Sequence, residues 1–261
     1  MKEFKLSIIT VTYNSLKELI KTRSSILLLF EKYPLLIEHI IIDGNSNDGT
    51  LNFLKKPLKF NTRYLCEKDN GIYDAMNKGI KLSRGEYILF LNSGDELNKE
   101  FIQHFDLILS DIKKKVDLIC WNVIQKFQHK NKFSIIKPNF RKVFIHHQGT
   151  LINSNLHSDN LYDLTFKYAS DFDFFKKIFR QKKITFTYID KNLTTFYLGG
   201  VSNSKYTLLD RHIERLLILN QEKKINISSL IKYWVLFFLK ILIINFFGYE
   251  TFIGLKNKLS K

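Results

Sequence analysis

Proline and cysteine are scarce in this chain of 261 residues, which has three prolines and two cysteines. No Ser/Gly-rich joint, internal repeat or low-complexity segment interrupts the sequence before about residue 205. Cys66 and Cys120 each lie in an apolar, strand-like run, and their spacing fits neither a metal site nor a disulfide framework, which indicates a reducing compartment. The start of the chain also lacks the apolar core of a signal peptide. We therefore expect the catalytic part of the protein to stay in the cytoplasm.

Acidic residues are also few, with 25 Asp and Glu against 41 Lys and Arg, and the formal net charge is +16. Such an excess of positive charge suits polyanionic partners: nucleic acid, an anionic membrane surface or phosphorylated substrates. The length allows one large α/β domain, alone or with a C-terminal extension. We expect a domain over residues 1–204 and an extension over residues 205–261.

The first half of the sequence alternates apolar runs with helical patterns. Runs at residues 6–12, 37–43, 63–67 and 87–91 predict strands. Because these runs are continuously apolar rather than alternating, they indicate a mostly parallel, Rossmann-like sheet with helices on both faces. Ligands of such sheets bind outside the carboxyl ends of the strands.

Each of these four runs leads into small polar residues, so four polar loops should meet at one edge of the sheet. The segments are TVTYN at 10–14, IDGNSNDGT at 42–50, DNGIYDAMNKG at 69–79 and GEYILFLNSGD at 85–95. In order and spacing they resemble the successive motifs of the family 2 glycosyltransferases, and most closely the bacterial branch that builds exopolysaccharide, capsule or lipopolysaccharide. The resemblance covers about residues 4 to 200. It implies the GT-A fold, a nucleotide-sugar donor, a divalent cation and inversion at the anomeric carbon.

The resemblance also implies roles for the polar residues at the strand ends. The nucleotide base would lie near Thr10, Tyr13 and Asp43, where a carboxylate can accept the uracil N–H; the alternative is that Asp43 ends its strand by bonding the following backbone. Asp69 and Asn77 would line the nucleotide, or else cap and pack the helix that follows. The predicted nucleotide-sugar-binding residues are Thr10, Tyr13, Asn14, Asp43, Asp69, Asn77, Asn92, Ser93 and Asp95.

Asp95 is the predicted metal ligand. Family members usually carry Asp-x-Asp-Asp after this strand, and here the positions read Asn92-Ser93-Gly94-Asp95, so one carboxylate remains. Mn²⁺ or Mg²⁺ prefers oxygen ligands, and one or two carboxylates with substrate phosphates and water suffice. The alternative for Asp95 is a helix cap.

The second half is expected to supply the acceptor side of the site. Adjacent histidines, His146 and His147, do not make a zinc site without a third ligand at suitable spacing. By resemblance, His147 and Gln148 line the sugar pocket, Asp171 is the catalytic base of an inverting transfer, and Asp173 is a reserve or acceptor contact. Ser170 replaces the Glu that usually precedes the base, and both Ser170 and Asp171 also suit a helix N-cap.

A mobile loop and a basic tail complete the resemblance. Gly199, Gly200 and Ser202 would belong to a loop that closes over the diphosphate, and the alternative is a simple turn into the next helix. Residues 205–261 carry ten Lys or Arg against four Asp or Glu, around an almost wholly apolar stretch at 233–248. This stretch is shorter than the roughly 20 residues that span a bilayer. We expect a helix lying on the anionic inner face of the plasma membrane, with a buried homodimer helix and a true span as alternatives.

Taken together, these features predict a peripheral, metal-dependent glycosyltransferase that uses a UDP-sugar and a saccharide or lipid-pyrophosphate-linked acceptor, and no nucleic acid. One alternative is a nucleotidyltransferase acting on sugar phosphates, but the first strand is not followed by the Gly-rich, basic phosphate loop it would need. Another is a non-enzymatic basic module that binds membranes or nucleic acid.

Overall fold

The computed structural model describes residues 4–127, 130–181, 183–198 and 207–221, with the isolated residues 234, 235, 238, 239 and 242. The chain divides into two units, Met1–Leu198 and Gly199–Lys261. The predicted loop residues Gly199, Gly200 and Ser202 lie outside the described residues, as does most of the apolar stretch at 233–248.

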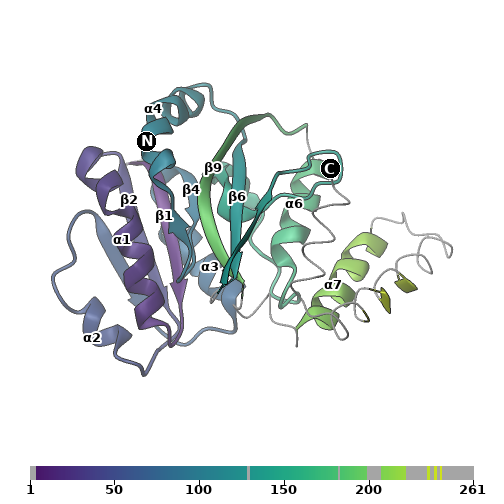
Figure 1. Cartoon of the computed structure of the whole chain (residues 1–261), viewed down its shortest axis with the longest axis horizontal. Coiled ribbons are helices and arrows are strands. Elements are labelled where there is room, and N and C mark those ends of the chain that lie inside the picture. The colour runs from purple at the N-terminus through teal and green to yellow at the C-terminus, as the bar shows by residue number, and fades with distance from the viewer. Residues whose placement is uncertain are drawn as a thin grey trace. The chain divides into compact units, whose positions relative to one another are not determined.

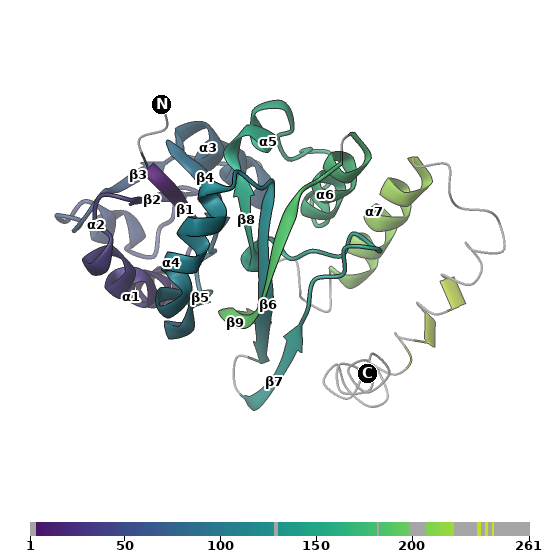
Figure 2. The same ribbon diagram turned by 90° about the horizontal axis from the view of Figure 1, so that it is seen from above.

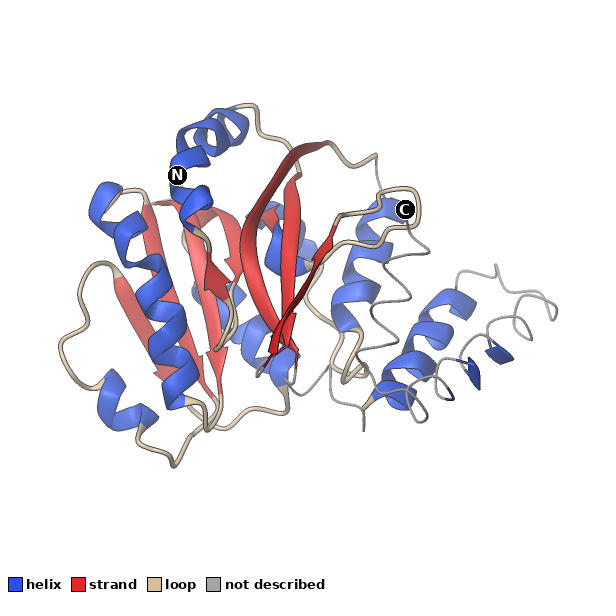
Figure 3. Ribbon diagram, viewed as in Figure 1, coloured by secondary structure: helices blue, strands red, loops and turns tan. Residues whose placement is uncertain are grey.

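Nine strands of the first unit join into one sheet (Figure 3). The strands are β1 (Phe4–Thr12), β2 (Ile37–Asp43), β3 (Thr62–Cys66), β4 (Gly85–Phe90), β5 (Glu96–Leu97), β6 (Leu118–Phe127), β7 (Lys130–Ile136), β8 (Thr150–Asn153) and β9 (Phe186–Leu198). Their order is β3-β2-β1-β4-β8-β6-β9-β5, and β7 pairs with β6. The first four strands are parallel, as the apolar runs predict. The other half is mixed, because β8 runs antiparallel to both β4 and β6 while β6 and β9 are parallel.

Helices cover both faces of this sheet. The helices of the first unit are α1 (Leu16–Lys32), α2 (Thr50–Leu54), α3 (Ile72–Leu82), α4 (Lys99–Lys113), α5 (Ser154–Asp159) and α6 (Ser170–Gln181), with the 3-10 turn η1 (His147–Gly149). Figure 2 shows α1 and α4 on one side of the strands and α3 and α5 on the other. The predicted α/β architecture is confirmed.

Residues of β1 alternate between two apolar cores. Leu6 and Ile8 pack in the cluster that includes Ile26 of α1 and Phe105 of α4. Ile9 and Val11 point to the other face and pack in the second cluster, with α3, α5 and α6. Since each face of the strand needs apolar side chains, a strand buried on both sides appears in the sequence as an uninterrupted apolar run.

The second unit contributes one described helix, α7 (Leu208–Gln221), in which Leu216 and Ile218 are buried. Among the helices that the structure describes, none has the length and apolar character needed to cross a bilayer.

Candidate active site

The register of the sheet brings the polar loops to one edge. Thr12 lies opposite Asp43 in the β1–β2 pair, and beyond them the Gly44 N–H donates to the Thr12 carbonyl at 3.0 Å. On the other side of β1, the Ser93 N–H donates to the Val11 carbonyl at 3.1 Å. Backbone hydrogen bonds thus continue past the strand ends and hold the loops side by side, as we expected from the sequence (Figure 1).

The loop after β1 is tied to the loop after β2. Asn14 adopts a left-handed backbone with φ of 47°. Its N–H donates to the Ser46 hydroxyl at 2.8 Å, and its side-chain oxygen accepts from the Asn47 N–H at 2.9 Å. These bonds leave the neighbouring Tyr13 side chain 63% exposed, so a flat aromatic face is presented beside the strand ends.

Gly44 allows two predicted nucleotide contacts to approach each other. A Cβ at Gly44 would lie 2.5 Å from a carboxylate oxygen of Asp69 and 3.2 Å from the Tyr13 ring. Asp69 also accepts a hydrogen bond from the Gly71 N–H at 2.9 Å. Any side chain larger than hydrogen at Gly44 would separate Tyr13 from Asp69.

Asp43 and Thr10 have protein partners. Asp43 is fully buried and accepts hydrogen bonds from the Ser46 N–H at 3.0 Å and from the Cys66 thiol at 3.0 Å. This is the strand-ending arrangement considered from the sequence, and the contact with uracil stays a prediction. Thr10 has no exposed surface, and its hydroxyl donates to the Leu91 carbonyl at 2.8 Å. This bond holds β1 to the segment after β4, and the predicted contact of Thr10 with the nucleotide base stays a prediction.

Asn77 holds α3 to the segment before α6. Its side chain donates to the Tyr162 carbonyl at 2.8 Å and accepts from the Tyr162 N–H at 2.9 Å. Asn77 is 6% exposed, which matches the packing role considered as an alternative. Its place along the nucleotide stays a prediction.

Asp95 lies in a largely buried position after β4. Burial raises the pKa of its carboxyl to about 8, although hydrogen bonds from the backbone of Asn92 and Tyr197 and from the Gln148 side chain act in the opposite direction. Gly94 makes the turn possible, with φ of 96° and an N–H that donates to the Thr22 hydroxyl at 2.9 Å. The loop therefore holds a carboxylate that is costly to ionise without a cation.

The oxygen atoms around Asp95 fit a hard divalent cation. The Asn92 side-chain oxygen and the Ser93 hydroxyl are buried, and neither has a hydrogen-bond partner among the described residues. Together with Asp95 they offer one carboxylate and two neutral oxygens, which Mn²⁺ or Mg²⁺ can complete with phosphate oxygens and water. No cluster of three or more His, Cys, Asp or Glu side chains suited to a metal occurs in the described ranges. A cation here would depend on a ligand that brings its own oxygens.

Asp171 stands at the start of α6 and contacts two other segments. The Tyr73 hydroxyl of α3 donates to one carboxylate oxygen at 2.9 Å, and Nδ1 of His147 lies 3.3 Å from the other. The Asp171 side chain is 21% exposed, so part of the carboxylate can still be reached. Burial and the Asp171 charge hold the pKa of Tyr73 well above its usual value, which keeps the phenol protonated as a donor.

Asp173 is placed differently from Asp171. It is 3% exposed, and its carboxylate lies 2.6 Å from the Lys177 ammonium one turn along α6. Burial raises the pKa of Asp173, while Lys177 lowers it. The structure thus gives Asp173 an ion pair within the helix, and its predicted acceptor contact stays a prediction.

The turn η1 connects the two halves of the site. His147 contacts Asp171, and the adjacent Gln148 bonds Asp95. Both side chains are at most 9% exposed. The carboxylates predicted to serve the metal and the acceptor are therefore held by consecutive residues.

Several residues near these carboxylates were not foreseen from the sequence. Tyr73 belongs to the helical segment after β3, where its only signal was an aromatic residue in the first turn. Lys21 lies 2.8 Å from Glu96 and 3.4 Å from the centre of the Tyr197 ring, and the Tyr197 hydroxyl donates to Glu96. The Thr12 hydroxyl is buried at a strand end and has no partner in the described part of the chain.

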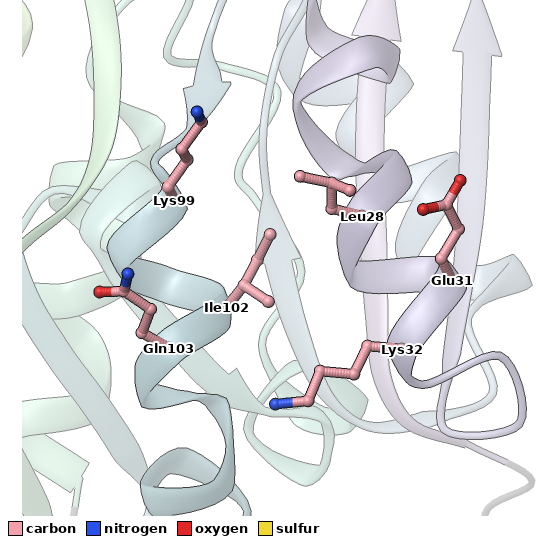
Figure 4. A pocket seen from close by; sticks show the side chains of 6 residues that line it. All are labelled: Leu28, Glu31, Lys32, Lys99, Ile102 and Gln103. Atoms are coloured by element: carbon pink, nitrogen blue, oxygen red, sulfur yellow. The ribbon is translucent and has the colours of Figure 1, made fainter.

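A separate groove lies between α1 and α4. Leu28, Glu31 and Lys32 line it from α1, and Lys99, Ile102 and Gln103 from α4 (Figure 4). None of these is a predicted site residue, so the groove is not part of the strand-end site.

Comparisons with known proteins agree with this arrangement. The family model described as glycosyl transferase family 2 matches residues 7–184. An uncharacterized glycosyltransferase of Mycobacterium tuberculosis is 30% identical over 176 residues, which are 65% of this chain and 66% of the relative. The chain thus spans just under two thirds of the length of that relative.

Two Staphylococcus aureus proteins extend the comparison. The poly(ribitol-phosphate) beta-N-acetylglucosaminyltransferase TarP is 30% identical over 237 residues, 87% of this chain and 67% of TarP. The crystal structure of TarS residues 1–349 in complex with UDP-GlcNAc has a TM-score of 0.66 at 20% identity, covering 88% of this chain and 69% of that chain. The TarS likeness supports the fold, and the family match covers the strand-end loops and the start of α6. The chain belongs to glycosyltransferase family 2.

Proposed function

We propose that this chain transfers a sugar from a UDP-sugar to a hydroxyl of a saccharide or lipid-linked acceptor, in the synthesis of a bacterial surface polysaccharide. The observation that carries the proposal is the pair of carboxylates, Asp95 and Asp171, held by consecutive residues of η1. The name of TarP and the UDP-GlcNAc complex of TarS support a UDP-sugar as the donor.

On the donor side, Tyr13 offers a ring for the base, while Asp95, Asn92 and Ser93 offer oxygens for a cation. When bound, Mn²⁺ or Mg²⁺ supplies positive charge against the diphosphate as it leaves. The protein's part is to hold these oxygens in a largely buried loop. Because the loop offers a single carboxylate and phosphate oxygens of the donor would have to complete the cation site, donor and cation should bind together rather than singly.

On the acceptor side, Asp171 is the base. The acceptor oxygen attacks the anomeric carbon, its proton passes to the Asp171 carboxylate, and the bond to the diphosphate breaks on the opposite face of the sugar, which inverts the configuration. General base catalysis of this kind contributes typically about 10²–10⁴-fold to the rate. The ion pair that buried Asp173 makes with the partly exposed Lys177 favours Asp171 for this role.

The proposal places the enzyme at the cytoplasmic face of the plasma membrane. Support comes from the net charge of +16 and from the ten basic residues of positions 205–261. Basic residues beside an anionic leaflet contribute about 1 kcal/mol each to binding. An acceptor carried on a lipid pyrophosphate would be reached at that surface.

A donor screen tests the function directly. UDP-, GDP- and dTDP-sugars are added with and without Mn²⁺, and the thermal unfolding temperature of the full chain is followed. We expect UDP-sugars to raise it, and only with the cation. Stabilisation by a GDP- or dTDP-sugar instead would contradict the UDP assignment, and a chain that no sugar nucleotide stabilises would contradict the transferase.

A further inference from the structure

Both oxygens of the Asp171 carboxylate already have protein neighbours before any acceptor arrives. Tyr73 reaches one oxygen from α3, at 2.9 Å, and His147 reaches the other from η1, at 3.3 Å. These three residues come from parts of the chain that lie far apart in sequence. Their meeting is therefore a property of the fold, and helix capping does not account for it.

Tyr73 is suited to donate and nothing else. It is 5% exposed, and its ring packs against Tyr162 with centroids 5.3 Å apart. An ionised carboxylate only accepts hydrogen bonds, so the phenol proton must lie between the two oxygens. A hydrogen bond to the charged form of a carboxyl group favours that form.

His147 is fixed in one tautomer by the same reasoning. The nitrogen that faces Asp171 is Nδ1, so Nδ1 carries the proton. Nε2 is buried and has no partner in the described part of the chain, so a second proton there would be left unpaired. The rings of Phe90 and His147 pack edge-to-face, with centroids 6.0 Å apart, and this contact limits rotation of the imidazole. The Nδ1–H group of His147 therefore donates to Asp171.

We propose that Tyr73 and His147 form a two-donor clamp, which keeps the Asp171 carboxylate ionised and turned toward the acceptor side. The two residues are positioning residues, because they act through Asp171 and not on the substrate. The inference rests on the proposed function, in which Asp171 is the base. Tyr73, His147 and Tyr162 are among the titratable groups that lie around Asp171 in the described part of the chain.

Tyr162 provides a matched control. Its ring lies beside Tyr73 and it is 2% exposed, yet its hydroxyl makes no hydrogen bond to any described residue. Tyr162→Phe therefore removes a phenol hydroxyl from the same surroundings without removing a donor from Asp171. Tyr73→Phe removes a hydroxyl that does donate. The two variants therefore differ in whether the lost hydroxyl donates to Asp171, which is the feature that the clamp requires.

The decisive experiment follows the Asp171 carboxyl itself. Full-length protein carrying ¹³C at the aspartate carboxyl carbons is titrated by NMR, and the Asp171 signal is identified by its loss in Asp171→Asn. In Tyr73→Phe the carboxyl should titrate about one pH unit higher than in the wild type, as expected for one lost hydrogen bond to a charged group. In Tyr162→Phe its titration should not move. An unchanged titration in Tyr73→Phe would overturn the Tyr73 half of the clamp.

Two substitutions test the His147 half independently, which also covers a Tyr73→Phe that fails to fold. His147→Leu removes the donor and should raise the titration point. His147→Asn can present an amide N–H near the position of Nδ1 and should restore it. Equal titration in the Leu variant and the wild type would overturn this half.

Failure of the clamp can be told apart from failure of the proposed function. Binding of UDP with Mn²⁺ is measured by calorimetry on the same proteins. We expect the same affinity in wild type, Tyr73→Phe and His147→Leu, because the clamp lies on the acceptor side. A wild type that binds no UDP contradicts the function, whereas normal UDP binding with unmoved titrations contradicts the clamp alone.

Discussion

Asp95 is a carboxylate in an environment that disfavours its charge. Its pKa is raised to about 8 by burial. The native state then binds a proton that the unfolded state releases near pH 3.9, so the free energy of unfolding falls as pH rises from about 4 to about 8. Without donor and cation, the Asp95 carboxyl should therefore lower the free energy of unfolding of the wild-type protein at neutral pH.

Asp95→Asn should remove this destabilisation. We expect the variant to unfold at a temperature at least about 2–4 °C above that of the wild type at pH 8, for a gain of at least about 1 kcal/mol, with a smaller difference at pH 5. Binding of UDP with Mn²⁺ should be lost. Differential scanning fluorimetry at the two pH values measures the first effect and calorimetry the second. A variant less stable than the wild type at pH 8 would contradict the claim that the Asp95 carboxyl destabilises the native state.

Asp171→Asn tests the base. The amide keeps the size of the side chain in the first turn of α6, but it does not accept the acceptor proton. Turnover should fall by about two to four orders of magnitude, while affinity for UDP and Mn²⁺ stays the same. Release of UDP from the donor that the screen identifies gives the rate.

The natural comparison, Asp173→Asn, is expected to behave differently. It breaks the ion pair between buried Asp173 and partly exposed Lys177, so it should lower stability, and catalysis per folded molecule should be retained. If Asp173→Asn is folded but inactive while Asp171→Asn remains active, the catalytic base is Asp173 instead of Asp171.

The turn η1 packs closely against β6 because Gly149 has no side chain. A Cβ there would lie 2.5 Å from a methyl carbon of Val123 and 3.0 Å from the Trp121 carbonyl oxygen. The turn can approach the strand this closely only with glycine, and this approach sets the positions of His147 and Gln148.

Gly149→Ala should therefore disturb both carboxylates at once. We expect a loss of about 1–3 kcal/mol in stability from overpacking. Affinity for UDP with Mn²⁺ and turnover should both decline, unlike in Asp171→Asn. Val123→Ala in the same chain removes one of the two clashes and should recover part of each loss. No recovery would show that the Trp121 carbonyl alone sets the limit.

The strands of the first half could be predicted from the sequence because burial on both faces leaves a local signal. The run predicted at 37–43 coincides with β2 (Ile37–Asp43), and β3 begins one residue before its predicted start. The mixed pairing of β8 left no such signal, since its register with β6 joins Cys120 to Thr150 and depends on packing between distant segments.

The same limit applies to the site. Asp95 could be selected from its own loop, because a carboxylate after small residues at a strand end is visible locally. The role of Tyr73 could not be predicted from the sequence, since its partner Asp171 lies 98 residues away. The ion pair that occupies Asp173 is local, four residues along α6, and helical spacing could have indicated it.

The whole molecule should be sensitive to acid because two buried histidines are neutral. Burial lowers the pKa of His39 to about 3 and that of His157 to about 4. The unfolded chain takes up these protons near pH 6.5, so stability should fall as pH drops below that value and stop falling near the native pKa values. Between pH 6 and 4 each histidine contributes about 1.4 kcal/mol per pH unit.

Urea unfolding between pH 7 and pH 4.5 checks this slope. The ring of His157 stacks on that of Phe174, with centroids 4.5 Å apart, so His157→Phe can keep the ring contact while removing the titrating group. The variant should lose less stability on acidification than the wild type. Parallel pH dependences in the two proteins would exclude His157 as a contributor.

The basic tail can be tested by truncation after Gln221. The first unit has its own cores and the predicted donor-binding loops, so binding of UDP with Mn²⁺ should survive. Sedimentation with vesicles rich in phosphatidylglycerol should decrease, and added salt should weaken the attachment of the full chain. A truncated chain that still sediments with vesicles contradicts membrane attachment through the tail, and one that aggregates favours a buried or dimeric role.

Consecutive residues of η1 contact the two carboxylates, and this has a thermodynamic consequence. If a donor and cation bind at Asp95, they would also displace Gln148, and the peptide bond between Gln148 and His147 would pass part of that displacement to Asp171. If the donor raises affinity for the acceptor by some factor, the acceptor must raise affinity for the donor by the same factor. An enzyme built in this way would discriminate against a donor that arrives without its acceptor.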